Sequence, residues 1–172
     1  MENLKKYISE INDYPKEGII FKDINPIYKE PKLWNELMRP LEKLISKVKP
    51  DCIVGIESRG FIAASAIAYK LHIGFVPMRK PNKLPGKVIG VNYKLEYGED
   101  RLEVQQNLIK KNSKVIVIDD LLATGGTAAA AGCLIREAGG ILIGYAFLVE
   151  LTELKGRDNL DNNLFIESVI KY

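Results

Sequence analysis

The sequence predicts an α/β fold in which helices cover both faces of a mainly parallel sheet. Short apolar runs of strand length alternate along the chain with segments that have helical spacing. One run, at 115–118, contains only branched aliphatic residues, as a strand buried on both faces requires. Two carboxylates and a Gly-rich turn follow this run and precede a helix-forming alanine segment. Open α/β sheets bind their ligands at this place, beyond the carboxyl end of a strand.

The individual elements follow in chain order. Four apolar residues near the start share one face of a predicted first helix: Leu4, Tyr7, Ile8 and Ile11. A turn at 14–18 follows, and apolar spacing then predicts a helix over 33–48 that Pro40 should kink or divide. The remaining predicted elements are strands at 51–56, 74–78, 115–118 and 141–149 and helices at 60–71 and 126–138.

The composition is that of an ordinary globular protein of one domain, with 172 residues of which 47% are hydrophobic and 27% charged. The net charge of +3 is too small to indicate nucleic acid as a partner. No apolar run approaches the roughly 18 residues of a membrane helix, and the first residues lack the apolar centre of a signal peptide. Cys52 and Cys133 give neither a disulfide framework nor metal-ligand spacing. We therefore expect a cytoplasmic protein that binds neither nucleic acid nor membranes.

The Gly-rich turn at 124–127 has the properties of an anion site. It lies at a helix start, where free backbone N–H groups and the helix dipole attract negative charge. It matches neither GxxxxGK[ST] nor GxGxxG, so a single terminal phosphate fits it better than a triphosphate or a dinucleotide. The preceding Asp119 and Asp120 suit the hydroxyl groups of such a ligand or a divalent cation. A strand-turn-helix corner with a solvated acidic pair is the alternative.

Candidate phosphate ligands occur in two further places. Ser58 and Arg59 follow the strand predicted at 51–56, where they either bind phosphate oxygens or form a helix cap and a surface arginine. The segment 80–100 has little apolar periodicity, and such a long excursion is usually an active-site lid or a disordered segment. Its basic residues favour a lid over an anion, with a merely solvated loop as the alternative. With the strand end before it, these residues are Arg79, Lys80, Lys83, Lys87 and Lys94.

Five segments of the chain resemble the type I phosphoribosyltransferases, and among these the enzymes that use adenine. The sequence DDLLATGGT at 119–127 resembles the family's phosphoribosyl-diphosphate motif. The other segments are PKEGIIFKDINP at 15–26, ESRGF at 57–61, FVPMRKPNKLPG at 75–86 and YKLEYGEDRLEVQ at 93–105. The resemblance extends over about 13–160. It implies a type I phosphoribosyltransferase-like fold with a small N-terminal hood at about 13–30 and a long flexible lid loop at about 80–103.

The resemblance also implies a role for each matched residue. Asp119 and Asp120 hold the ribose hydroxyls, while Glu96 acts as general acid/base near the purine and Tyr97 closes over the reacting centre. The 5′-phosphate is bound by Ala123, Thr124, Gly125, Gly126 and Thr127. Pyrophosphate is bound by Ser58, Arg59, Arg79, Lys80 and Lys83. Adenine is bound by Ile20, Phe21 and Arg59.

The reaction that the resemblance implies is transfer of the 5-phosphoribosyl group from phosphoribosyl diphosphate to N9 of adenine. It gives AMP and pyrophosphate, a step of purine salvage. Mg²⁺ is held mainly by the substrate, so no direct protein ligand of the metal is expected. The resemblance further suggests a homodimer with Arg79 reaching across its interface, and a cis Glu57–Ser58 peptide bond. A sibling enzyme for another base and a nucleic-acid-binding regulator that has kept only the fold are the alternatives.

Three features stay without an assigned chemical role. Lys22 stands where many relatives have arginine, and a lysine cannot reproduce a bidentate arginine contact. The sequence LKGR at 154–157 resembles the family's tail, but it implies no chemistry. His72, which ends a predicted helix, is expected to be structural.

Overall fold

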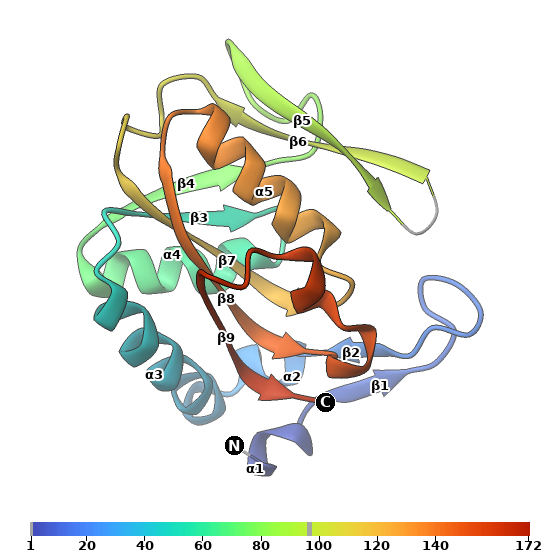
Figure 1. The fold of residues 1–172 in the computed structure, drawn as a ribbon. Coiled ribbons are helices and arrows are strands. Elements are labelled where there is room, and N and C mark those ends of the chain that lie inside the picture. The colour runs from blue at the N-terminus through green and yellow to red at the C-terminus, as the bar shows by residue number, and fades with distance from the viewer. Residues whose placement is uncertain (1, 96–97) are drawn as a thin grey trace.

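The central feature of the fold is a parallel sheet. The computed structural model describes residues 2–95 and 98–172 (Figure 1). The sheet strands are β3 (Cys52–Ile56), β4 (Gly74–Met78), β7 (Lys114–Leu122), β8 (Ile141–Glu150) and β9 (Phe165–Lys171). These five strands are all parallel and lie in the order β4-β3-β7-β8-β9. The predicted α/β class is therefore confirmed. Glu96 and Tyr97, to which the resemblance gives roles at the reacting centre, lie outside the described residues.

Helices and two antiparallel strand pairs surround this sheet. The helices are α1 (Glu2–Lys5), α2 (Asn25–Lys29), α3 (Pro31–Val48), α4 (Gly60–Leu71) and α5 (Gly126–Glu137), with the short 3-10 helices η1 (Thr152–Leu154) and η2 (Gly156–Asn159). The strand pairs are β1 (Ser9–Ile11) with β2 (Phe21–Asp23) and β5 (Val88–Leu95) with β6 (Gly98–Gln105). Figure 1 shows α3 and α4 on one face of the sheet and α5 with the β5–β6 hairpin on the other. Among the described residues, no helix is long and apolar enough to cross a membrane.

The strand β7 is buried on both faces, as its apolar run predicts. Val115 and Val117 belong to the core cluster that α5 covers, whereas Ile116 and Ile118 belong to the cluster under α3 and α4. All four side chains are fully buried, and each such burial contributes about 1.5–3 kcal/mol. The strand that ends at the candidate site is thus anchored from two sides.

The strand order creates a crevice at one edge of the sheet. From β3 the chain moves outward to β4 on one side, and it later returns to β7 on the other side of β3. When the chain segments that follow two neighbouring parallel strands run in opposite directions, a space remains beyond the carboxyl ends of the strands. Ligands bind in that space. The segment 57–59 follows β3, and Asp119 and Asp120 lie near the end of β7, so both flank this crevice.

The N-terminal helix is shorter than predicted. Helix α1 ends at Lys5, and Ile11 lies exposed in β1 instead of on a helical face. Leu4 and Ile8 enter the core, but Tyr7 does not. After this first turn, pairing of β1 with β2 supplies the backbone hydrogen bonds that a longer helix would have made.

Helix α3 continues through Pro40 and is not divided by it. Leu37, Leu41 and Ile45 are fully buried, so the apolar face is held in the core before and after the proline. Because proline has no N–H, the carbonyl of Glu36 lacks its usual helical donor. Glu36 is exposed, so this carbonyl lies on the solvent side of the helix.

The segment predicted as an irregular lid contains the hairpin β5–β6. Leu102 and Val104 are buried, and together with the half-buried Ile89 and Val91 they pack against the cluster under α5. Apolar contacts on one face thus give this segment regular structure. Strand β7 is also longer than predicted and includes both aspartates, and β9 was not predicted.

Candidate active site

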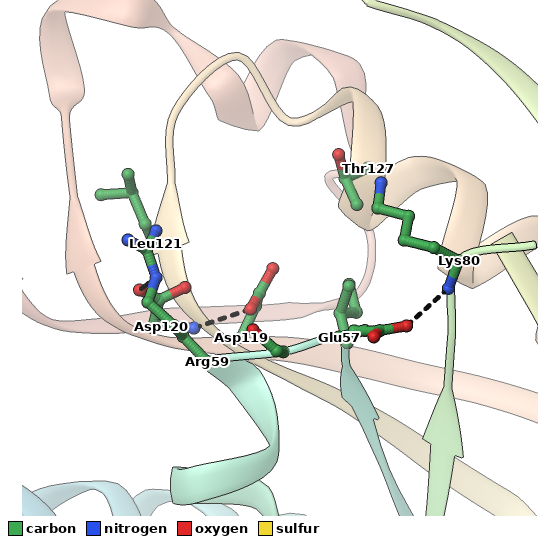
Figure 2. A pocket seen from close by; sticks show the side chains of 9 residues that line it. Glu57, Arg59, Lys80, Asp119, Asp120, Leu121 and Thr127 are labelled. Atoms are coloured by element: carbon green, nitrogen blue, oxygen red, sulfur yellow. Dashed lines mark hydrogen bonds and ion pairs between the residues drawn. The ribbon is translucent and has the colours of Figure 1, made fainter. Parts of the chain in front are cut away.

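The crevice between β3 and β7 holds a polar pocket of about 390 Å³ (Figure 2). Most of its walls come from the ends of these two strands and the residues that follow β3, and Lys80, two residues after β4, completes one side. The lining residues are Ile56, Glu57, Ser58, Arg59, Lys80, Asp119, Asp120, Leu121 and Thr127. A smaller pocket of about 90 Å³ is lined by Asp119 and by residues 121–128. Asp119, Leu121 and Thr127 line both, so the two pockets adjoin.

The smaller pocket is formed by the predicted phosphate loop at the start of α5. Gly125 precedes the helix with φ +83°, a left-handed conformation that glycine adopts without strain. No side chain of the described residues caps α5, so its first N–H groups are left for another acceptor. A helix N-terminus that opens on a small pocket attracts an anion the size of one phosphate group.

Two adjacent carboxylates line the larger pocket, and one of them, Asp119, also lines the smaller pocket. Asp120 is 5% exposed and forms an ion pair with Arg59, at 2.6 Å between Oδ2 and Nε. Asp119 accepts a hydrogen bond from the backbone N–H of Asp120 at 2.9 Å. Burial and then repulsion by Asp120 raise the pKa of Asp119 well above its ordinary value. Burial also raises the pKa of Asp120, although the Arg59 guanidinium opposes the shift. A buried and a half-buried carboxylate side by side favour a ligand that brings hydroxyl donors or positive charge.

The turn after β3 contains the cis Glu57–Ser58 peptide bond that the resemblance suggested. The Glu57 carboxylate accepts hydrogen bonds from Arg79 Nη2 at 2.9 Å and from the Lys80 backbone N–H at 2.8 Å. Burial raises the pKa of Glu57, but these hydrogen bonds outweigh burial and hold it below its usual value. Glu57 therefore links the ends of β3 and β4.

Of the basic residues predicted to bind pyrophosphate, the structure brings Arg59 and Lys80 into the pocket lining, together with Ser58. Arg79 faces Glu57 and also donates to the Lys83 carbonyl at 3.1 Å, and neither Arg79 nor Lys83 lines the pocket.

The β5–β6 hairpin is connected to the pocket through Lys80. The Lys80 ammonium donates to the Tyr93 hydroxyl at 2.7 Å and forms an ion pair with Asp100. Thr127 of the phosphate loop donates to the same tyrosine hydroxyl at 3.5 Å. Burial lowers the pKa of Lys80, but the hydrogen bonds to Asp100 and Tyr93 prevail and raise it, so this lysine is charged.

Sequence reasoning missed Glu57, Tyr93 and Asp100 as parts of this site. Glu57 follows a strand end just as the predicted site residues do, and that signal was available. Tyr93 and Asp100 lie directly opposite each other on β5 and β6, a pairing that becomes evident once the hairpin is known.

The predicted hood contacts a residue of the pocket lining, Arg59, through Phe21. The guanidinium of Arg59 lies 4.8 Å from the centre of the Phe21 ring, and Tyr14 packs edge-on against the same ring. Ile20, the other predicted base contact, is 51% exposed. An exposed apolar surface of this kind beside a polar pocket suits a flat aromatic ligand.

Lys22 of the hood has partners that do not line the pocket. Its ammonium forms an ion pair with Glu10 of β1 and lies 4.4 Å from the centre of the Tyr172 ring. The side chain is 14% exposed and joins the hood to the chain segment after β9.

Comparison with known proteins identifies the class that this fold and site define. The sequence model of the family described as "Phosphoribosyl transferase domain" matches residues 23–169, so the chain is a phosphoribosyltransferase. It is 74% identical over its whole length to an adenine phosphoribosyltransferase of Prochlorococcus marinus (strain NATL2A), and the match covers 100% of both chains. The chain belongs to the adenine phosphoribosyltransferase family, a family of transferases.

Solved structures agree with this assignment. The adenine phosphoribosyltransferase from Thermoanaerobacter pseudethanolicus has a TM-score of 0.96 and 45% sequence identity, and the match covers 99% of each chain. The Saccharomyces cerevisiae enzyme, solved with an imino-altritol bisphosphate and adenine, has a TM-score of 0.89 and 42% identity, covering 98% of this chain and 97% of that chain. The expected type I phosphoribosyltransferase fold is therefore confirmed.

Proposed function

We propose that this chain transfers the 5-phosphoribosyl group of phosphoribosyl diphosphate to N9 of adenine and releases AMP and pyrophosphate. The observation that carries the proposal is the junction of two pockets: an anion cradle at the start of α5 shares Asp119 with a larger crevice that basic side chains line. Phosphoribosyl diphosphate carries a phosphate, then the ribose hydroxyls, then a diphosphate. These groups match the anion cradle, the aspartates and the basic crevice in turn.

The sugar and its 5′-phosphate occupy the smaller pocket and its edge. Asp119 and Asp120 accept hydrogen bonds from the ribose hydroxyls, and backbone N–H groups of 123–127 bind the phosphate. Each hydrogen bond to a carboxylate is worth about 1.5–3 kcal/mol. Such bonds also hold the anomeric carbon at a fixed position beside the larger pocket.

The pyrophosphate group lies in the larger pocket, where Ser58, Arg59 and Lys80 line the wall. Arg59 and Lys80 are each paired with a carboxylate in the structure, with Asp120 and Asp100 respectively. On binding, they exchange these partners for phosphate oxygens and stabilise the negative charge that develops on the leaving group. Arg79 and Lys83, which lie next to this wall, are proposed to join them in the closed complex.

Mg²⁺ suits this site as an ion carried by the substrate. The oxygen ligands that magnesium prefers are present as Asp119 and Asp120, but within the described residues no group of three or more His, Cys, Asp or Glu side chains is arranged to hold a metal. When bound to the diphosphate, Mg²⁺ neutralises charge and makes pyrophosphate a better leaving group.

The purine binds under the hood. Phe21 covers one face of the base and Arg59 lies against it; the proposal rests on the contact of Phe21 with Arg59, which lines the pocket. Stacking of one base on an aromatic ring contributes about 1–3 kcal/mol. Backbone groups at Ile20 are proposed to read the exocyclic amine, as the family resemblance implies. We further propose a cytoplasmic homodimer in which Arg79 reaches the interface.

A direct assay tests the function. We expect the purified protein to convert adenine and phosphoribosyl diphosphate to AMP and pyrophosphate when Mg²⁺ is present, with chromatography of the labelled base as the measurement. Removal of Mg²⁺ with EDTA should abolish turnover, and excess Mg²⁺ should restore it. Preference for hypoxanthine, guanine, xanthine or orotate under the same conditions would contradict the assignment of adenine, and folded protein that converts no base would contradict the proposed activity.

Glu96 is proposed to manage the purine proton, with Tyr97 closing over the reacting centre. General acid–base help is typically worth about 10²–10⁴-fold in rate. Glu96→Gln should therefore lower kcat by at least about 10²-fold while leaving the Kd for AMP close to that of the unaltered protein. A near-normal kcat in single-turnover and steady-state measurements would remove Glu96 from the mechanism.

A further inference from the structure

The segment after β8 packs directly beneath the phosphate loop. Gly156 is buried, and a Cβ atom added to it would lie 2.1 Å from the Ala123 carbonyl oxygen. The contact is reciprocal, because a Cβ on Gly125 would lie 2.2 Å from the Gly156 carbonyl oxygen. Two backbone segments therefore touch here, and glycine on both sides is what allows it.

Hydrogen bonds join the same two segments. The Asn159 side-chain amide donates to the Thr124 carbonyl at 2.7 Å, and the Leu151 backbone N–H donates to the Leu122 carbonyl at 2.9 Å. We call residues 151–159, which include η1 and η2, the floor of the loop. The floor contacts carbonyl oxygens of the loop at residues 122, 123 and 124.

This contact fixes the direction of the loop's donors. A trans peptide unit is planar, and its C=O and N–H groups point in opposite directions. Carbonyls of Ala123 and Thr124 that face the floor therefore turn the N–H groups of Thr124 and Gly125 away from it. The smaller pocket is lined by loop residues and by none of the floor, so it lies on the side to which these donors point.

An ion pair between Arg157 and the buried Glu150 holds the floor itself in place. Arg157 donates to the Glu150 carboxylate from Nε at 2.7 Å and from Nη2 at 2.8 Å, and its Nη1 donates to the Ile166 carbonyl at 2.9 Å. Glu150 is 4% exposed, and the hydrogen bonds from Arg157 lower its pKa below the usual value. The pair ties the residue next to Gly156 to the ends of β8 and β9.

We infer that Gly156 and Asn159 are positioning residues for the 5′-phosphate, supported by the Glu150–Arg157 ion pair. They touch the loop from the side opposite the anion and set the orientation of the N–H groups that bind it. The inference rests on the proposed function, since it takes the smaller pocket to hold the phosphate. It also gives the LKGR sequence at 154–157 a physical role.

The test compares ligands that need the phosphate cradle with one that does not. In Gly156→Ala, we expect the Kd for AMP by calorimetry and the KM for phosphoribosyl diphosphate to rise about tenfold or more, because a displacement of about 1 Å costs up to about 10²-fold. The KM for adenine at saturating phosphoribosyl diphosphate should change less than about threefold. Gly74→Ala is the matched control, because its Cβ would find Cys52 Sγ at 3.9 Å, an ordinary contact.

A second pair of variants decides the question if Gly156→Ala does not fold. Asn159 is exposed, and loss of its hydrogen bond in Asn159→Ala should raise the Kd for AMP about three- to tenfold. Asn159→Asp keeps the shape of the side chain but removes the amide N–H donor, and it should raise the Kd for AMP further. Asn163→Ala is the control, since that exposed side chain donates to Asp161 instead of to the loop.

The outcomes separate this inference from the proposed function. Unaltered protein that neither binds AMP nor turns over would overturn both. Unaltered protein that binds AMP, together with folded Gly156→Ala and Asn159→Ala variants that bind it equally well, would overturn the positioning role alone. A rise in the KM for adenine equal to the rise for phosphoribosyl diphosphate would also overturn it, because it would indicate a general disturbance of the site.

Discussion

Asp119→Asn should lower kcat/KM for phosphoribosyl diphosphate by about 10- to 100-fold and at the same time raise the melting temperature. The activity falls because a hydrogen bond from a ribose hydroxyl to a carboxylate is worth about 1.5–3 kcal/mol. A loss of about 1.4 kcal/mol corresponds to a factor of ten in kcat/KM. The asparagine keeps an oxygen that can accept the Asp120 backbone hydrogen bond, so the local backbone is expected to stay in place.

The gain in stability follows from the sign of the pKa shift. Burial, with repulsion by Asp120, raises the pKa of Asp119 in the folded protein. Between the ordinary carboxyl pKa and the raised pKa of Asp119, the folded state therefore binds more protons than the unfolded state. The free energy of unfolding falls as the pH rises through this range. Neutral asparagine removes this loss at pH 7, whereas well below the ordinary carboxyl pKa the two proteins should melt alike.

Thermal melts at several pH values and steady-state kinetics measure both effects of the Asp119 change. Glu137→Gln, which neutralises an exposed carboxylate at the far end of α5, is the control and should change neither quantity appreciably. A variant that melts at a lower temperature than the unaltered protein at pH 7 would contradict the pKa argument. A variant with unchanged kcat/KM would contradict the assignment of Asp119 to the sugar.

Gly60→Ala should damage the same site by a steric route. A Cβ atom on Gly60 would lie 2.6 Å from Asp119 Oδ1 and 3.0 Å from the Ile118 carbonyl oxygen. Alanine improves helix propensity by up to about 1 kcal/mol, but overpacking against backbone costs about 1–3 kcal/mol, so we expect the clash to prevail. The melting temperature should fall by a few degrees, and kcat/KM should fall about 10²-fold as the Asp119 carboxylate moves.

The control for Gly60→Ala is again Gly74→Ala, which makes the same change where there is room. If Gly60→Ala retains full activity, the start of α4 can move without disturbing Asp119, and the close approach is not needed for the site. A crystal structure of the variant with AMP would show how far the carboxylate shifts.

The centre of the fold was predictable because its strands are buried on both faces. The part of β7 that is buried on both faces, at 115–118, is apolar throughout, and the charged Asp119 and Asp120 follow it within the same strand. The helix at 60–71 and the strand at 74–78 were predicted with the bounds that the structure shows. The Gly-rich turn at the start of α5 was predictable for the same reason, because its hydroxyls and glycines follow the buried strand closely.

Elements with one exposed face were harder to predict. Strand β9 carries Glu167 and Ser168 in its middle, so it has no continuous apolar run. In the hairpin, Ile89, Val91 and Tyr93 do alternate with Gly90 and Asn92, a period-two signal that the surrounding charges obscured. Local periodicity also cannot show where β1 finds its partner, which is why the first helix was predicted too long.

Pairings across the site could not be predicted at all. Arg79 and Lys80 are adjacent in sequence, yet one faces Glu57 and the other Asp100. Glu57 follows β3 and Asp100 lies on β6. Which basic residue meets which carboxylate therefore depends on how the strands are arranged. The contact of Gly156 with Gly125 is of the same kind, because it joins backbone segments that only the complete fold brings together.

Among the described residues, β1 and the hood strand β2 form a two-stranded sheet that shares no ladder with the five central strands. If base recognition and sugar binding are divided as proposed, residues near β2 set the choice of base and the turn at the start of α5 sets the affinity for the sugar phosphate. A chimera that grafts residues 9–23 from a relative of different base preference should inherit the donor's selectivity and keep the recipient's sugar affinity. Such a graft must preserve the contact of Lys22 with the Tyr172 ring, which joins β2 to the segment after β9.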